Sequence, residues 1–270
     1  MSAFSDLLRP VSRSEALRAE ILPDFLQGRA AFGGLVGALC VRALRTCVAD
    51  DRPLRSVTMS FAAPARVGEV EIEPSVLQEG GAATQAQATL RQNGAVCAVA
   101  LASFGAPRNA TLALVPAMAP AQPPSETYEP VPFIPGLTPE FTQHFEYRWP
   151  EAVMPFTGNG RGTMAGWIRL RADIPPSESF LVALGDAWPT PVLPMLTELG
   201  VISTLSWSLE ICGRAPLQPS DHWWQVRAAA EQAADSYVHQ ETRFWTREGH
   251  LALVGRQVVA VFSAGQGKTA

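Results

Sequence analysis

The sequence predicts an α+β fold in which one unit, a helix with an antiparallel meander, occurs twice along 270 residues. Three observations support this prediction. A proline-rich segment divides the chain nearly in half. Each half has one helical stretch among several strand-like segments. Each half also carries a hairpin signal, Asn93-Gly94 in the first half and the tripeptide REG at 247–249 in the second.

The proline-rich segment sets the expected domain boundaries. Eight prolines between 116 and 139 exclude both a helix interior and a central strand, so we expect an extended linker over these residues. The linker leaves a first domain over 1–115 and a second over 140–270. Both have the size of an ordinary domain.

The first half begins with FGGLVGALCVRALRTC at 32–47, where apolar residues recur at helical spacing after two glycines. Arginines fall on the other face, so we expect one amphipathic helix. Strand-like segments follow at 54–64, 67–80 and 83–104. The last of them contains Asn93-Gly94, which favours a tight type I′ turn.

The second half repeats this order. A helical stretch broken by proline is expected over 180–199, and residues 222–245 are long enough for one or two strands. The other strand-like segments are 144–154, 163–173, 203–211 and 250–262.

Composition narrows the class of protein. Hydrophobic residues make up 47% of the chain and charged residues 17%, which is typical of a globular protein with a sizeable core. The net charge of −4 offers no field to attract a nucleic acid. No apolar run reaches the roughly 18 residues of a membrane span, and the N-terminus lacks the pattern of a secretory signal. We expect a cytoplasmic protein.

Cysteine usage agrees with that compartment. The four cysteines stand in apolar or small-residue surroundings, without the C-x-x-C spacing of a zinc or redox site. We expect reduced core thiols. The cysteines are Cys40, Cys47, Cys97 and Cys212.

Because the unit occurs twice, the two halves can be compared position by position. Hairpin turns, strand starts and helix starts serve as alignment points. The resulting pairs are Ala102 with Gln257, Thr58 with Thr204, and Gly34 with Asp186.

A helix wrapped by an antiparallel sheet and used twice is the layout of a double hotdog. The segments FGGLVGALCVRAL and QEGGAATQAQATLRQNGAVCAVALASFG resemble the N-terminal half of the TesB-like acyl-CoA thioesterases. The segments LGDAWPTP, STLSWSLEI and LALVGRQ resemble their C-terminal half. The resemblance spans nearly the whole chain in the right order. It implies two tandem hotdog repeats, each with a long helix.

A thioester can be hydrolysed without a covalent nucleophile, because its thiolate is a good leaving group. The reaction needs a positioned water, a base, and donors for the oxyanion. In the family these tasks fall to an Asp, a Thr and a Gln, which the resemblance places at Asp186, Thr204 and Gln257. It implies acyl-CoA as substrate, with no metal or organic cofactor. The backbone N–H groups of Gly33 and Gly34, at a helix N-terminus, are the expected oxyanion donors.

Asp186 also has a structural interpretation, because Asp is a preferred N-cap residue. Pro194 lies too far along for an unbroken helix to begin at Asp186. We therefore expect Asp186 to begin a broken helix and to face a water as well. We expect the orientation of this water to matter more than the basicity of the carboxylate.

The other two residues have structural alternatives too. Thr204 is a common type of residue on a strand. Gln257 lies among apolar residues, so an inward orientation would require hydrogen-bond partners. Four tryptophans in the second half favour core or subunit interface over a ligand cage, although an acyl tunnel stays open. They are Trp207, Trp223, Trp224 and Trp245.

Two other functions remain as alternatives. One is a non-catalytic acyl-binding or assembly protein with the same fold. The other, a hydratase or dehydratase, needs a histidine paired with a carboxylate near the helix start, and the sequence shows none there. The histidines stand singly and are expected at the surface or an interface. They are His144, His222, His239 and His250.

The remaining expectations concern two glycine-rich segments, two arginines and the oligomeric state. GNGRG at 158–162 is interpreted as a loop, and GQGKT near the C-terminus as a tail, because neither precedes a helix. Arg161 and Arg169 are candidates to meet the CoA phosphates. Hotdog sheets associate edge to edge, so by analogy we expect a homo-oligomer.

Overall fold

A computed structural model describes residues 17–109, 114, 118–198, 200–212 and 218–262. The first 16 residues, where no secretory signal was expected, and the GQGKT tail lie outside the described residues. No helix among the described residues is long and apolar enough to cross a membrane.

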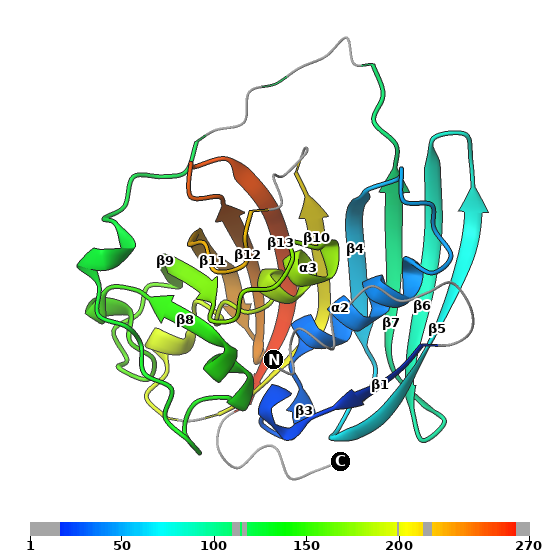
Figure 1. Ribbon diagram of the computed structural model, residues 1–270. Helices are drawn as coiled ribbons and strands as arrows, with labels where there is room; N and C mark the ends of the chain where they lie inside the picture. The colour runs from blue at the N-terminus through cyan, green and yellow to red at the C-terminus, as the bar shows by residue number, and fades with distance from the viewer. Residues whose placement is uncertain (1–16, 110–113, 115–117, 199, 213–217, 263–270) are drawn as a thin grey trace.

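The structure is built on one antiparallel sheet of eleven strands, which curves around two helices (Figure 1). A small second sheet pairs β2 (Leu26–Gln27) with β3 (Ala30–Ala31). The strands of the large sheet lie in the order β1 (Leu17–Ile21), β5 (Gly68–Glu79), β6 (Ala83–Gln92), β7 (Ala95–Gly105), β4 (Leu54–Phe61), β10 (Val201–Ile211), β13 (Leu251–Phe262), β12 (Tyr237–Trp245), β11 (Trp224–Ala234), β9 (Thr163–Leu170) and β8 (Phe145–Arg148).

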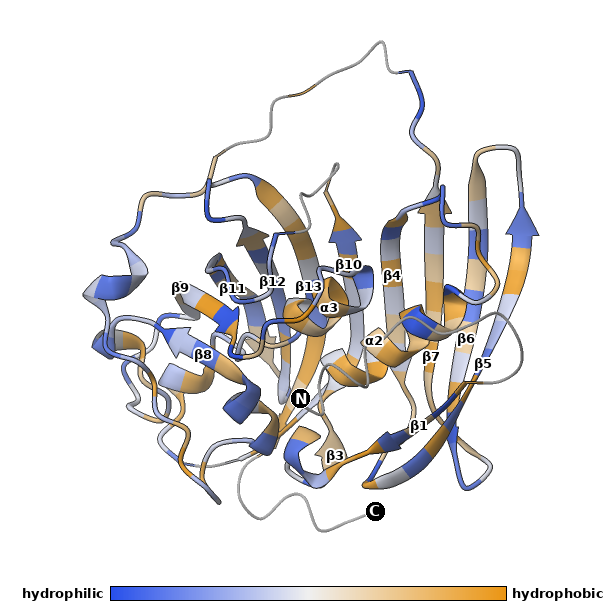
Figure 2. Ribbon diagram, in the orientation of Figure 1, coloured by the Kyte–Doolittle hydropathy of each residue, from blue (hydrophilic) through white to orange (hydrophobic). Residues whose placement is uncertain are grey.

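The two helices, α2 (Gly33–Leu44) and α3 (Glu178–Gly185), lie on the same face of the sheet, and both are largely hydrophobic (Figures 1 and 2). Arg45, just after α2, forms an ion pair with Glu178 in the first turn of α3. The helices therefore run antiparallel. The short 3₁₀ segments are η1 (Pro23–Phe25), η2 (Ser125–Thr127), η3 (Glu140–His144), η4 (Glu151–Val153) and η5 (Leu193–Met195).

The hairpin predictions are confirmed. Asn93 and Gly94 have φ of 52° and 80°, the left-handed backbone of a type I′ turn between β6 and β7. Residues 222–245 form two strands rather than one, joined at Asp235 and Ser236 with φ of 52° and 65°. Neither Asp235 nor Ser236 is a glycine, which is why the turn between these two strands was harder to predict.

The predicted second helix was wrong in position. It spans Glu178–Gly185, eight residues against twelve in α2, and so is not a long helix. The side chain of Ser177 caps its first turn by accepting a hydrogen bond from the N–H of Phe180 at 3.1 Å. Prolines from Pro189 onward prevent continuation. Asp186 consequently follows the helix instead of beginning it.

The two halves of the sheet match in fine detail. Reading outward from the centre, β4, β7, β6 and β5 correspond to β10, β13, β12 and β11. Each half has three β-bulges at matching places. The matching pairs are Leu54/Ser56 with Thr204/Ser206, Val76/Gln78 with Ala230/Gln232, and Leu90/Arg91 with Phe244/Trp245.

The core lies between the helix pair and the concave face of the sheet, and the four tryptophans are buried in the protein as predicted. All four cysteines are free, but the prediction of core thiols was wrong for two of them. Cys40 and Cys97 are buried, whereas Cys47 is exposed and Cys212 is half-buried.

The described part of the linker runs along the second half of the sheet. Its backbone accepts hydrogen bonds from side chains of that half, Gln225 to Pro120 at 2.6 Å and Trp167 to Pro123 at 2.9 Å. These bonds tie the linker to the strands. The expectation of an extended linker holds only in part, because η2 (Ser125–Thr127) and a turn at 135–137 interrupt it.

Candidate active site

Asp186 is the C-cap residue of α3, and its carboxylate faces the first turn of α2. The backbone N–H of Gly34 and the side-chain amide of Gln257 both donate hydrogen bonds to it. The first N–H groups of a helix have no intrahelical acceptor, so the α2 N-terminus is a natural place for a negative charge. One helix therefore presents the carboxylate and the other receives it.

Burial dominates the electrostatics of Asp186. Loss of hydration raises its pKa from 3.8 to about 7, against the lowering effect of the hydrogen bonds from Gln257 and Gly34. The carboxyl group is thus surrounded by protein, although the residue as a whole is only half-buried. At neutral pH it can exist as either acid or base.

Gln257 points inward from β13 into a chain of hydrogen bonds. Its Oε1 accepts from Nε2 of Gln240 on β12 at 2.8 Å, and Oε1 of Gln240 accepts from the hydroxyl of Thr190 at 2.5 Å. These bonds supply the partners that an inward Gln257 requires. The chain of residues Asp186, Gln257, Gln240 and Thr190 is called the relay below.

Thr204 lies at the bulge of β10, opposite Val259. The bulge sets Thr204 and Trp207 on the same concave face although they are three residues apart. Gln257 shares this face, because it lies directly opposite Trp207. Among the described residues, no hydrogen bond joins Thr204 to Asp186 or Gln257. The structure thus brings two of the three predicted residues into contact and places the third on the same face.

The matching bulges test the residue pairs from the sequence. They agree with the pairing of Ala102 with Gln257. Each of these residues lies four positions after the bulge in its own strand, β7 or β13, and the two bulges match. The pairing of Thr58 with Thr204 was wrong, because the counterpart of Thr204 at its bulge is Leu54. Thr58 is exposed on the opposite face of the sheet.

The pairing of Gly34 with Asp186 was also wrong, because Gly34 begins a helix and Asp186 follows one. They are in contact instead. The residue in the place of Asp186 is Arg45, the C-cap residue of α2, which binds Glu178 with its Nε at 2.6 Å. Oε1 of Glu178 also accepts from the N–H of Leu54 at 2.7 Å. The first half therefore has an arginine in the matching place, ion-paired with Glu178 of the second half.

Glycine at the start of α2 leaves room beside the carboxylate. A Cβ at Gly33 would lie 2.8 Å from Oδ2 of Asp186 and 3.1 Å from the ring of Phe61. A Cβ at Gly34 would lie 2.6 Å from the carbonyl oxygen of Ala183. Both positions require glycine for close approach.

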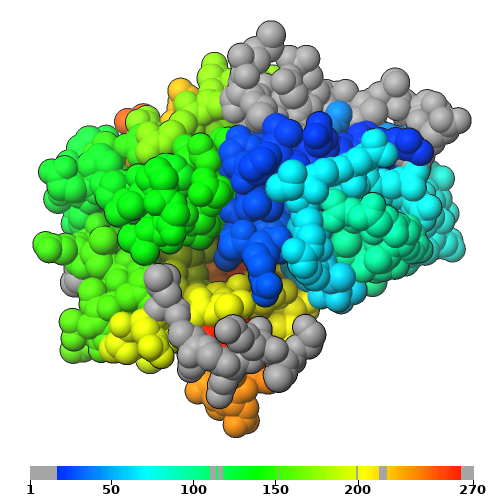
Figure 3. Space-filling model, turned by 90° about the horizontal axis from the view of Figure 1, so that it is seen from below, coloured from blue at the N-terminus to red at the C-terminus, as the bar shows by residue number. Residues whose placement is uncertain are grey.

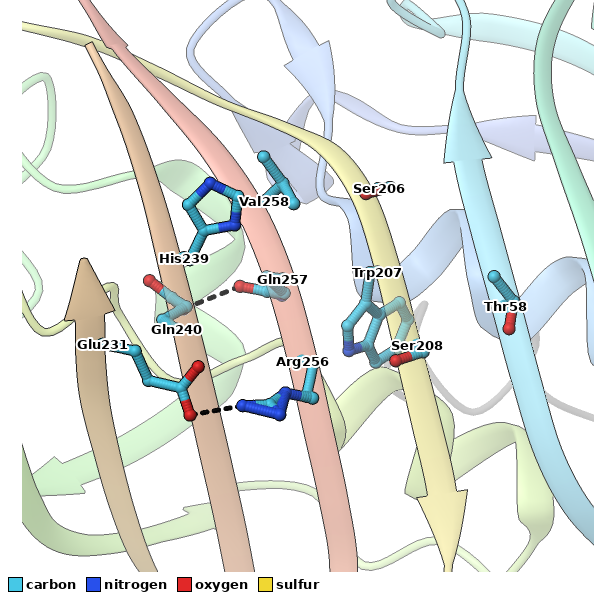
Figure 4. A pocket seen from close by; sticks show the side chains of 10 residues that line it. All are labelled: Thr58, Ser206, Trp207, Ser208, Glu231, His239, Gln240, Arg256, Gln257 and Val258. Atoms are coloured by element: carbon cyan, nitrogen blue, oxygen red, sulfur yellow. Dashed lines mark hydrogen bonds and ion pairs between the residues drawn. The ribbon is translucent and has the colours of Figure 1, made fainter. Parts of the chain in front are cut away.

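A hollow of about 430 Å³ lies on the other face of the sheet (Figure 4). Its side chains alternate along the strands with those that face the helices, and Glu231 and Arg256 form an ion pair within it. Gln240 and Gln257 contribute to its floor but direct their side chains to the relay. The hollow is consequently separate from the Asp186 carboxylate.

One histidine is paired with a carboxylate, contrary to the sequence analysis. Nε2 of His144 lies 3.2 Å from Oδ2 of Asp24, and its ring stacks on Phe25 at 4.4 Å between centroids. Phe25 in turn accepts a hydrogen bond from Phe32, just before α2. This pair ties the N-terminal segment to the second half, where the two meet in Figure 3 (blue against green).

The two arginine candidates differ. Arg169 is held by Glu146 at 2.6 Å and lies over the ring of Trp223 at 4.5 Å, so its charge is already matched. Arg161 lies exposed in the loop before β9. Among the described residues, no group of three or more His, Cys, Asp or Glu side chains could hold a metal ion.

Sequence reasoning missed three residues around Asp186. Thr190 and Gln240 belong to the relay, and the hydroxyl of Tyr147 on β8 donates to the carbonyl of Ala187 at 3.1 Å. Gln240 had a detectable signal, because it occupies an inward position between the buried residues Val238 and Thr242. Thr190 and Tyr147 had none.

Solved structures with the same architecture define the class as the hotdog fold. A conserved protein of unknown function with a hot dog fold from Alicyclobacillus acidocaldarius has a TM-score of 0.85 and 21% identity, covering 98% of this chain and 99% of that one. A putative thioesterase II from Thermobifida fusca has a TM-score of 0.81 and 21% identity, with 97% and 98% covered. Acyl-CoA thioesterase II TesB2 from Mycobacterium marinum has a TM-score of 0.78 and 17% identity, with 98% and 100% covered.

Family models narrow this class. A model of the acyl-CoA thioesterase N-terminal domain matches residues 22–105, and a model of the C-terminal domain matches residues 123–261. The chain belongs to the acyl-CoA thioesterase family, which confirms the resemblance drawn from its motifs. Among curated proteins, no relative matches the sequence.

Proposed function

We propose that the protein hydrolyses acyl-CoA to a free carboxylic acid and CoA, using a water activated by Asp186 with the help of Thr204 and Gln257. The observation that carries this proposal is the buried Asp186 carboxylate, held between the N–H of Gly34 and the amide of Gln257. Its pKa of about 7 suits a base that must take and return a proton at neutral pH.

The chemistry follows from these groups. Asp186 takes a proton from a water whose oxygen adds to the thioester carbonyl carbon, and the carbonyl oxygen becomes an oxyanion. The N–H of Gly33, which has no intrahelical acceptor, is the proposed donor to that charge. The N–H of Gly34 is already used by Asp186. Collapse of the tetrahedral intermediate breaks the carbon–sulfur bond, and the CoA thiolate receives the proton.

The proposed site is built on the second of two hotdog repeats, over 140–270, joined by the linker at 116–139 to the first repeat over 1–115. The first repeat has Leu54, Ala102 and Arg45 where the second has Thr204, Gln257 and Asp186, and Arg45 is ion-paired with Glu178 of the second repeat. Neither Leu54 nor Ala102 can donate or accept through its side chain. We therefore expect one active site per chain. A cytoplasmic location and a homo-oligomer stay predictions.

The test is a free-thiol release assay with short, medium and long acyl-CoA substrates. Release above the heat-denatured control for any chain length supports hydrolysis. Binding of acyl-CoA without release from any of them would instead support a non-catalytic acyl-binding protein and contradict the proposal.

A further inference from the structure

We propose that Thr190 and Gln240 are positioning residues, which hold the Gln257 amide with its nitrogen toward Asp186. The inference rests on the proposed function, because it assigns them a part in preparing the same carboxylate. Neither belongs to the trio implied by the family resemblance. Both are buried, with exposed fractions of 8% for Thr190 and 3% for Gln240.

Chemistry fixes the direction of every bond in the relay. An ionised carboxylate can only accept, so Gln257 must present its Nε2 to Asp186. This leaves Oε1 of Gln257 to accept from Nε2 of Gln240, and Oε1 of Gln240 to accept from the hydroxyl of Thr190. Reversing either amide would oppose oxygen to oxygen or leave buried donors unpaired. The relay therefore has one satisfied orientation, and it directs a donor to Asp186.

The first half shows that the fold does not need these polar groups. Ala86 and Ala102 lie opposite each other on β6 and β7 in the places of Gln240 and Gln257. Both alanines are buried, at 1% and 2% exposed. A buried amide must be hydrogen-bonded to avoid a cost in stability, so two of them side by side indicate a task other than packing.

The relay also returns to the segment that carries Asp186. Thr190 is four residues after Asp186, and the segment between them is held by the bond from Tyr147 to Ala187. The relay therefore begins and ends on the same short segment of the chain. Burial raises the pKa of Tyr147 on β8, and the nearby charge of Asp186 raises it further.

The test compares Gln240→Leu and Thr190→Val with the wild type, and Thr190→Ser as the conservative variant that keeps the hydroxyl. Thr242→Val is the matched control, since Thr242 is a buried threonine on the same strand, outside the relay. The pKa of Asp186 is measured by NMR titration of carboxyl-¹³C aspartate, assigned with Asp186→Asn. Steady-state thiol release gives kcat and KM.

The relay predicts that Gln240→Leu and Thr190→Val raise the pKa of Asp186 by about 0.5 to 1 unit, because the donor from Gln257 is no longer held. It also predicts a fall in kcat of about tenfold with little change in KM. In Thr190→Ser and in Thr242→Val, both the Asp186 pKa and kcat should stay at the wild-type values.

An unchanged Asp186 pKa in folded Gln240→Leu and Thr190→Val would overturn the inference. The titration needs no substrate, so its result stands apart from the proposed function. If the wild type releases no thiol but the pKa moves, the relay is upheld and hydrolysis is contradicted. If the wild type releases thiol and the Asp186 pKa does not move in the variants, hydrolysis is upheld and the relay is contradicted. Should Gln240→Leu fail to fold, Thr190→Val decides.

Discussion

Asp186 and Arg45 occupy the same place in the two halves of the molecule. Each is the C-cap residue of its helix, and each contacts the first turn of the other helix. Arg45 meets an acid, Glu178, and forms an ion pair, whereas Asp186 meets the backbone of Gly34. The antiparallel helix pair thus ends in a neutralised charge at one side and a buried, unneutralised carboxylate at the other.

The pH dependence of kcat/KM should follow Asp186, because this parameter reports the ionisation of the free enzyme. The pKa of Asp186 is raised to about 7 by burial, and only the ionised form can act as a base. We expect kcat/KM to be low at acidic pH and to rise through about pH 7. A profile of kcat/KM over a range from pH 5 to 9 checks this; a value that stays flat down to pH 5 would contradict it.

Gly33→Ala should damage activity more than stability. The added methyl group would lie 2.8 Å from Oδ2 of Asp186, where the thioester must approach. We expect kcat/KM to fall by at least about tenfold. Gly37→Ala is the matched control, because it adds a methyl in the same helix against Val182 and Trp207. Equal losses of kcat/KM in the two variants would show that the effect is one of packing.

Thr204→Val tests the residue whose role depends most on the family resemblance. If its hydroxyl holds the water, kcat should fall by about tenfold or more at an unchanged melting temperature. Thr58→Val, on the exposed face of the neighbouring strand, provides the control. Unchanged kcat in Thr204→Val would leave Asp186 and Gln257 as the site and remove Thr204 from it.

The Arg45–Glu178 pair should contribute to stability and not to chemistry. Both side chains are largely buried, and Glu178 also accepts from Leu54. We expect Glu178→Gln and Arg45→Met each to lower the free energy of unfolding by about 1–3 kcal/mol. In urea denaturation the double variant should lose less than the sum of the two. Strict additivity would mean that the pair does not interact.

The strand segments, the hairpins and the duplicated plan were within reach of the sequence, because alternation and turn residues act locally. Asn93-Gly94 is the clearest case, since both residues adopt the backbone that their types favour. The predicted meander was wrong for the first strand of the unit, because β4 pairs with β7 and not with β5. The second helix was misplaced because the prolines at 189–194 were interpreted as breaks within it, whereas they lie beyond its end. Its start is marked by the N-cap residue Ser177. That placement also reversed the end of the helix at which Asp186 lies.

The site was predictable only in part. Asp186 and Gln257 were identified through motifs and prove to be hydrogen-bonded. Thr190 and Gln240 lie 50 residues apart in the chain, and Gln240 and Gln257 lie 17 apart, so no local pattern encodes the contacts that join them. The comparison of halves misplaced Thr204 because the short motifs that were aligned are four residues out of register: the counterpart of Thr204 is Leu54 and not Thr58. Long-range contacts and bulges become visible in three dimensions alone.

The central claim is that the Asp186 carboxylate activates the water. Thiol release from the best acyl-CoA substrate by Asp186→Ala, beside Asp51→Asn as a control for loss of a surface charge, tests it most directly. We expect kcat to fall by about 10²-fold to 10⁴-fold in Asp186→Ala, with the fold intact by circular dichroism, and to be unchanged in Asp51→Asn. Turnover near the wild-type rate in folded Asp186→Ala would contradict the account.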